Sequence, residues 1–223
     1  MHKENGLCSE HELLKILETV GPDVVFEEIR PADFDSYYRH RSRSRLETRA
    51  VIRYLKVRSA QQVPVDDYVI PESFPRDIAS LDEYVGSNSI EYCELMDEID
   101  QKTHLLGFRY LSSSEFEALN KRASESYEKS IAISSSEDLK NRLSMLNDQL
   151  RKRDASMVEK IYDFCRNNQF TEGVFLVGAG HKSSIVEDIE NRMKTEANLV
   201  DWNIWNGAAA QQIVAPDAAP RRR

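Results

Sequence analysis

The sequence has little of what disulfide-linked or membrane-spanning proteins need. Its three cysteines are far apart and form no Cys-x-x-Cys pair, which argues against a disulfide framework or a cysteine-based zinc site. The longest run of aliphatic or aromatic residues, 174–177, has four members, whereas a helix that crosses a bilayer needs about 20. No apolar segment near Met1 has the form of a secretory signal. The expectation is a cytoplasmic protein with no membrane partner.

Basic residues are fewer than acidic ones: the chain has 30 Lys and Arg residues and 38 Asp and Glu residues, which gives a net charge of −8 at pH 7. A general nucleic-acid binder carries the opposite excess, so nucleic acid is not an expected partner. The 223 residues are 40% hydrophobic and 30% charged, which is the composition of a globular chain. A chain of this length can bury a core without disulfides or a structural metal.

Helical and extended patterns alternate along the chain. Ser9 precedes Glu12 at capping-box spacing and begins a helix that Gly21 ends. The strand candidates are residues 23–29, 62–66, 173–178 and 199–205. Between them, residues 71–168 have an almost wholly helical pattern. This order predicts an α/β fold, with a mostly parallel central sheet flanked by helices and a large helical insertion at about 71–168.

Residues 1–205 are therefore expected to form a single α/β domain. From residue 206 the composition shifts to Ala, Gln and Pro, and the chain ends in three arginines. Such a segment has little apolar surface to bury, so 206–223 is predicted to be a disordered tail.

Polar side chains follow three of the strand candidates. Glu27 and Glu28 end the first strand, Asp66 and Asp67 follow the second, and Gly178-Ala-Gly-His181 follows the third. Ligands of open parallel sheets bind at the carboxyl ends of the strands, so these side chains mark the candidate site. A neutral imidazole together with carboxylates suits a Zn²⁺, Mn²⁺ or Fe²⁺ ion, or a general acid–base pair without a metal.

His181 is the central candidate among these residues. Gly178 and Gly180 are expected to let the backbone turn sharply from strand to helix, so that the imidazole lies over the sheet edge. The alternative is a histidine that only caps the helix or stabilises a loop.

The two adjacent glutamates are expected to have different surroundings. Glu28 shares a strand face with Phe26, whereas Glu27 lies on the opposite face. If the strand is central, each carboxylate needs a partner. Asp66 is a third candidate carboxylate, with stabilisation of a turn as its alternative role.

The long helical stretch at 139–164 carries an interrupted apolar stripe. Its heptad series has leucine at positions 139 and 146 and arginine at 153. An arginine on a buried stripe needs an acidic partner or an anionic ligand. We expect Arg153, next to Asp154, to reach the site and polarise a substrate carbonyl. The alternative is an ion pair at the end of the packed stripe.

One segment departs from the negative balance of the chain. Residues 39–58 contain eight basic residues and one acidic residue, and Arg45, Arg49 and Arg53 share a helical face. This face is expected to be solvated and paired with acidic neighbours, and its alternative role is to bind phosphate or RNA.

Three segments resemble motifs of a known superfamily. Residues 22–28 (PDVVFEE), 151–157 (RKRDASM) and 173–181 (GVFLVGAGH) occur in the order found in the erythromycin esterase/ChaN-like superfamily. The chain is most similar to its TraB/Tiki/PrgY group, over about residues 9–205. The resemblance implies an α/β core. Members include metal-dependent peptidases, esterases that open macrolide lactones, and haem-binding proteins.

The resemblance also assigns roles to residues. Gly178 and His181 match the second Gly-x-x-His motif, Glu28 the acidic residue after an early strand, and Arg153 the arginine of a late helix. The first strand of the family and its Gly-x-x-His motif have no counterpart, so the chain is expected to begin one strand too late. His2 lies where the histidine of that first motif would fall.

The leading hypothesis is a metal-dependent hydrolase of the peptidase or esterase type. Its metal ligands would be His181, Glu28, His2 and Asp66, its catalytic residues Glu28, Arg153 and His181, and its cofactor-binding residues Gly178 and Gly180. The metal would activate a water, and the arginine would stabilise the oxyanion. The alternatives are a haem or other ligand-binding protein without catalysis, and an inactive relative that acts as an interaction module. The expected partner is a small-molecule or peptide substrate, with a homo-oligomer as a further option.

Overall fold

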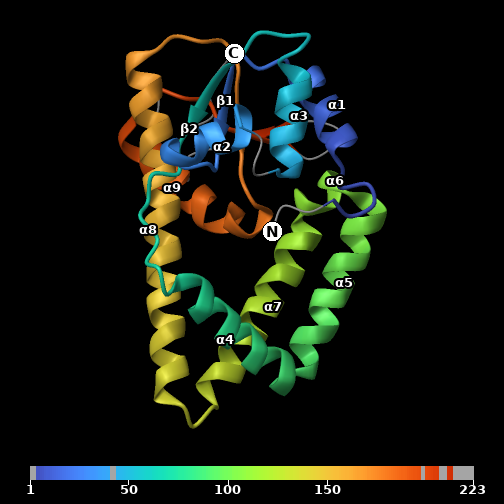
Figure 1. Cartoon of the computed structure of the whole chain (residues 1–223), viewed down its shortest axis with the longest axis vertical. Helices are drawn as coiled ribbons and strands as arrows, with labels where there is room; N and C mark the ends of the chain where they lie inside the picture. Colours follow the sequence, from blue (N-terminus) through green and yellow to red (C-terminus); the bar gives the residue numbers. More distant parts are fainter. Residues whose placement is uncertain (1–3, 41–43, 197–198, 206–209, 213–223) are drawn as a thin grey trace.

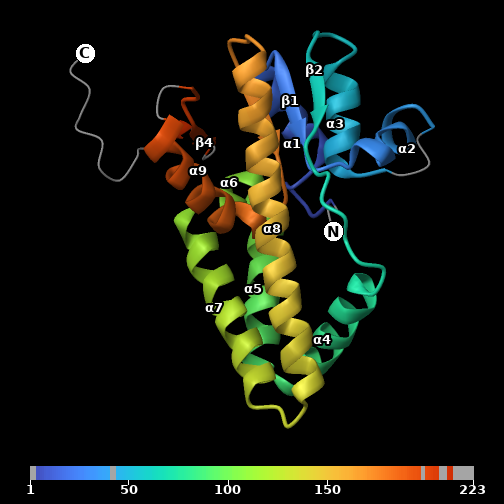
Figure 2. The ribbon, with the colours of Figure 1, turned by 90° about the vertical axis from the view of Figure 1, so that its left-hand side faces the viewer.

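The computed structural model describes residues 4–40, 44–196, 199–205 and 210–212. A three-stranded sheet and its covering helices lie at one end of the molecule, and a group of long helices lies at the other (Figure 1). The strands run toward these long helices, so the carboxyl edge of the sheet faces them (Figure 2). The predicted α/β fold with a large helical insertion is confirmed.

The sheet is parallel throughout and has the strand order β2-β1-β3. Its strands are β1 (Val24–Glu27), β2 (Gln61–Pro64) and β3 (Gly173–Leu176). All four residues of the central strand β1 are buried, as expected for a strand covered on both faces. Pro64 ends an edge strand. The N–H groups of Gln61 and Val65 donate to the carbonyls of Asp23 and Glu27 on the side of β1. The nitrogen of Pro64 therefore lies on the outer side, where a missing N–H costs no ladder bond.

One face of the sheet is covered by α1 (Glu10–Val20) and α3 (Leu46–Tyr54). The first of these helices begins and ends as predicted: the Ser9 hydroxyl accepts from the Glu12 N–H at 3.3 Å, and Gly21 ends it with a φ of 65°. The buried residues on this side of the sheet are Cys8, Leu13, Leu14, Leu17, Val25, Leu46, Ala50, Val51 and Tyr54. The helical spacing of the leucines directs them toward the strands.

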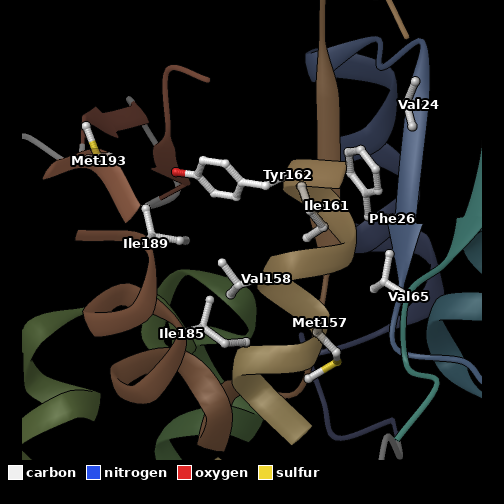
Figure 3. Packing of buried hydrophobic residues seen from close by; sticks show 10 residues of the cluster. All are labelled: Val24, Phe26, Val65, Met157, Val158, Ile161, Tyr162, Ile185, Ile189 and Met193. Carbon is white, nitrogen blue, oxygen red and sulfur yellow. The ribbon is translucent and has the colours of Figure 1, made fainter. Parts of the chain in front are cut away.

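The other face is covered by α8 (Glu137–Asn167), and α9 (Lys182–Glu196) packs on the far side of α8 (Figure 3). This core consists of Val24, Phe26 and Val65 beside the sheet, Met157, Val158, Ile161 and Tyr162 on α8, and Ile185, Ile189 and Met193 on α9. The α8 residues recur at intervals of three and four, so they contact both the sheet and α9. Phe26 meets Phe164 edge to face, with ring centroids 5.4 Å apart.

The helical insertion has cores of its own. It consists of α4 (Phe74–Asn88), α5 (Ile90–Leu106), α6 (Phe108–Leu111), α7 (Ser114–Ala132) and the first half of α8. Tyr110 and Phe116 pack in one core, and Leu81 and Ile131 pack in the other. With 31 residues, α8 is about 46 Å long and belongs to both the insertion and the sheet layer.

The remaining elements are short. They are η1 (Pro31–Asp33), α2 (Phe34–Tyr38), η2 (Ala179–His181), β4 (Asn203–Trp205) and β5 (Ala210–Gln212). The fourth predicted strand exists, but it pairs antiparallel with β5 in a separate ribbon and does not extend the parallel sheet. β5 lies in the segment 206–223, of which the structure describes residues 210–212, so the disordered tail stays a prediction. No helix in the described ranges is long and apolar enough to cross a membrane.

Truncating a side chain in the core between the sheet and α9 should strongly lower the stability of the protein. Ile161 is 1% exposed, so Ile161→Ala should lower the free energy of unfolding by about 2–5 kcal/mol through the cavity it leaves. Ile133→Ala removes the same atoms from a residue that is 78% exposed after α7, and should cost less than about 0.5 kcal/mol. Urea unfolding of both variants measures the difference. Equal losses would contradict a core at this position.

Candidate functional site

Glu28 is the central carboxylate of the site, directly after β1. Its side chain is only 7% exposed because it follows the central strand on the face that α8 covers. One carboxylate oxygen, Oε1, accepts from Nη2 of Arg153 at 2.5 Å, and Oε2 accepts from the N–H of Gly178 at 2.9 Å. The partners that this buried carboxylate requires therefore come from α8 and from the end of β3.

Arg153 joins Glu28 to a second carboxylate, Asp66. The Asp66 oxygens accept from Nε of Arg153 at 3.1 and 3.2 Å and from Nη2 at 2.8 Å. Burial would lower the pKa of Arg153, but the hydrogen bonds and charges of Asp66 and Glu28 outweigh burial and raise it. The guanidinium therefore stays charged. Of the two options expected for the arginine that interrupts the apolar stripe, an acidic partner and an anionic ligand, the structure shows the first, as an ion pair. Its role toward a substrate stays a prediction.

His181 lies beside this ion pair at the end of η2. Its Nδ1 is 2.6 Å from Oδ1 of Asp154, and its Nε2 is 3.7 Å from Oε1 of Glu28. Burial would lower the pKa of His181, and Arg153 also opposes protonation. The hydrogen bond and charge of Asp154, with the charge of Glu28, outweigh both effects and raise the pKa above 6.5.

The structure thus brings together four residues that the sequence singled out, namely Glu28, Asp66, Arg153 and His181. Asp154 completes the cluster; the sequence placed it beside Arg153 but gave it no role of its own. It is 3% exposed and follows Arg153 on α8. The sequence did contain a sign of this role. Asp154 is a second charged residue, next to Arg153, on the buried side of an amphipathic helix. The helix-cap alternative for His181 is not supported, because its side chain bonds to Asp154. The alternative of a histidine that stabilises a loop is compatible with this bond.

The two glycines before His181 act differently from the prediction. The N–H of Gly178 binds Glu28, but its φ is −60°, and Gly180 is not among the described glycines with positive φ either. The turn is made by η2, in which the N–H of His181 donates to the Gly178 carbonyl at 2.9 Å. A Cβ built on Gly180 would meet nothing within 4 Å, so the space beside it is open. The expected need for glycine conformations at this turn is wrong.

The predicted metal ligands do not fit a cation as they are arranged. The carboxylate oxygens of Glu28 and Asp66 are engaged by Arg153 and by a backbone N–H, so a divalent ion would have to displace a guanidinium. Within the described ranges, no group of three or more His, Cys, Asp or Glu residues is arranged to hold a metal. His2 lies outside the described residues. Metal binding stays a prediction.

Glu27 occupies the opposite face of β1 and is 2% exposed. It accepts from the Tyr38 hydroxyl of α2 and, at 3.1 Å, from Nε2 of Gln62 on β2. Burial raises the pKa of Glu27 to about 7, against the lowering effect of these two hydrogen bonds. The expectation that each glutamate of a central strand needs its own partners is confirmed.

The basic face of α3 is largely paired. Arg49 contacts Glu10 at 2.9 Å and Glu4 at 3.0 Å, and Arg53 contacts Glu10 at 3.2 Å. Arg45 points elsewhere and donates to the Glu28 carbonyl at 3.0 Å. The prediction of pairing with acidic neighbours is confirmed for Arg49 and Arg53.

No protein-family model, curated protein sequence or solved structure matches this chain. The resemblance to the erythromycin esterase/ChaN-like superfamily therefore stays a prediction, and the function has to be inferred from the geometry of the site.

Because the ion pair is buried, removing its cation should strongly lower the stability of the fold. Arg153→Met leaves Glu28 and Asp66 buried without a counter-charge, and should lower the free energy of unfolding by about 3–5 kcal/mol. The control is Arg166→Met, because Arg166 is 37% exposed and pairs with Glu196 at the surface; it should cost less than about 1 kcal/mol. Denaturant unfolding at pH 7 compares the two. Similar losses would contradict the burial of the Arg153 pair.

Glu27 predicts a pH-dependent stability. Between pH 4.5, the ordinary pKa of glutamate, and about 7, the folded protein binds a proton that the unfolded chain releases. This contribution to stability is complete below the unfolded pKa and is lost as the pH rises through 7. From pH 5 to pH 8, the wild type should lose about 2–3 kcal/mol more unfolding free energy than Glu27→Gln.

Urea titrations at the two pH values measure this difference. Glu83→Gln changes an exposed glutamate of α4 and should keep the pH dependence of the wild type. A Glu27→Gln variant with an unchanged pH dependence would show that the carboxyl group does not titrate in this range.

Proposed function

We propose that this protein hydrolyses an ester or amide bond at the carboxyl edge of its sheet, with His181 as the general base that activates water. One observation carries the proposal: the imidazole is held at 2.6 Å by buried Asp154, while its other nitrogen faces Glu28 beside the fixed cation of Arg153. A base oriented by a carboxylate and adjacent to a preorganised cation suits acyl transfer to water.

His181 has the geometry of a base. Asp154 accepts a hydrogen bond from the Nδ1–H, which leaves the lone pair of Nε2 available. The 3.7 Å between Nε2 and Oε1 of Glu28 is too long for a direct hydrogen bond, so Nε2 is left to bind a water. The side chain of His181 is 18% exposed, the most accessible of the cluster.

Arg153 is suited to polarise the carbonyl group. Its Nε and Nη2 bind the two carboxylates, and Nη1 has no acceptor among the described residues. This N–H can therefore donate to a substrate oxygen. Glu28 and Asp66 act as positioning residues, because they hold the guanidinium plane in place.

In the proposed reaction, the water oxygen attacks the carbonyl carbon while one water proton passes to Nε2 of His181. The carbonyl electron pair moves to the oxygen, where Arg153 stabilises the negative charge. The C=O bond then re-forms as the bond to the leaving group breaks. The leaving group takes the proton from His181 and departs as an alcohol or an amine, and the products contain every atom of substrate and water.

Base catalysis takes the place of the expected metal activation in this proposal, because the carboxylates of the site are bound to Arg153. A Zn, Mn or Fe requirement stays a prediction that the donor set does not favour. Haem binding also stays a prediction, and it would have to use Nε2 of His181, which faces Glu28. A cytoplasmic location and a small-molecule or peptide substrate remain part of the proposal.

The His181–Asp154 pair predicts both a rate loss and a shift in pH dependence. Asp154→Asn removes the charge that raises the pKa of His181, so the acidic limb of kcat/KM should move to lower pH. The loss of orientation should reduce kcat/KM by about 100-fold or more. Asp163→Asn, at an exposed position of the same helix, is the matched control and should change neither quantity.

A panel of p-nitrophenyl esters and p-nitroanilides supplies the assay, with EDTA-treated protein measured in parallel. The absence of any turnover that depends on His181 would refute the proposal. Activity that EDTA abolishes and Zn²⁺, Mn²⁺ or Fe²⁺ restores would replace it with the metal-dependent form.

A further inference from the structure

A cavity of about 420 Å³ lies in the insertion, between the start of α4 and the first half of α8. This volume is in the usual range of small-molecule sites, about 300–1,000 Å³. Its lining includes Phe74 and Arg76 from α4, and Arg142, Met145, Leu146 and Gln149 from α8. None of the residues of the hydrolytic cluster lines it.

The cavity and the hydrolytic cluster share one face of α8. Arg142, Leu146 and Gln149 precede Arg153 at spacings that put all four on the same side of the helix. With a rise of about 1.5 Å per residue, Gln149 lies about 6 Å and Arg142 about 16 Å from Arg153 along the helix axis.

A second segment of chain also leads from the cluster to the cavity. Asp66, which holds Arg153, is followed by a segment that runs from β2 to α4 and reaches the cavity at Ser73 (Figure 2). The same two segments of chain therefore border the reacting centre and the cavity, and a long ligand between them would contact both.

The lining of the cavity indicates the chemistry of such a ligand. Arg142 is held by Asp77 and, at 2.7 Å, by Asp138, so the carboxylates of the cavity already have a cation. Arg76 is exposed and has no acceptor among the described residues. Phe74, Met145 and Leu146 supply apolar surface beside it. An apolar chain that ends in a carboxylate matches this combination, because a free guanidinium binds carboxylates through paired N–H groups.

We propose that the cavity binds the distal end of the substrate, and that this substrate is an ester or amide whose apolar acyl chain ends in a carboxylate. The inference rests on the proposed hydrolytic function. The acyl carbonyl lies at His181 and Arg153, the chain follows α8, and the terminal carboxylate binds Arg76.

Kinetics with two matched esters test the inference. One is the mono-p-nitrophenyl ester of dodecanedioic acid, and the other is the same compound with its free acid as a methyl ester. Arg76→Gln should raise KM for the acid about tenfold with kcat unchanged, and should leave both constants for the methyl ester unchanged. Arg122→Gln removes an exposed arginine of α7 and is the control, which should leave the constants for both esters unchanged. Equal effects of Arg76→Gln on the two esters would overturn the inference.

Calorimetric binding separates this failure from failure of the hydrolytic proposal. Dodecanedioate should bind wild type and His181→Ala equally and bind Arg76→Gln about tenfold more weakly. If neither ester is turned over in a His181-dependent way but this binding pattern holds, the cavity is a carboxylate site and the hydrolytic function is wrong. Equal binding by wild type and Arg76→Gln would refute the carboxylate site itself.

Discussion

The ion pair of Arg153 with Glu28 and Asp66 is the interaction on which the rest of the site depends. It joins α8 to the ends of β1 and β2 in a region where all three side chains are at most 12% exposed. Buried charges are tolerated only when each has a well-placed counter-charge and hydrogen bonds. These short contacts therefore fix the position of α8 relative to the strand ends. The same contacts bring Asp154, the next residue on α8, to His181.

Glu27, the last residue of β1, and Glu28, the residue after it, show how a central strand separates two chemical environments. Glu28 faces α8, where a permanent cation balances its charge. Glu27 faces the opposite layer, where its hydrogen-bond donors among the described residues, Tyr38 and Gln62, are neutral, and burial raises its pKa to about 7. One carboxylate is thus paired with a cation and its neighbour with neutral donors, because successive side chains of an extended chain point to opposite faces of the sheet.

The helical insertion is attached at the carboxyl edge of the sheet and lies close to the site. Lys182, one residue after His181, donates to the Ser112 carbonyl at 2.7 Å and pairs with Glu117 of α7 at 2.6 Å. At the other side, α8 continues without a break from the insertion into the sheet layer. The insertion therefore lies beside the strand ends, and its cavity lies on the same helix face as Arg153.

The sequence by itself determined the local elements and the residues that needed explanation. Short apolar runs located the three parallel strands, and helical spacing located the long helix. The break in its apolar stripe at Arg153 required an acidic partner or an anionic ligand. Only the tertiary structure decided which groups meet: that Arg153 binds Glu28 and Asp66, that Asp154 orients His181, and that β4 pairs with β5 instead of joining the sheet. The physical reason is that periodicity fixes which face of an element is buried, whereas strand order and helix placement depend on packing between segments distant in the chain.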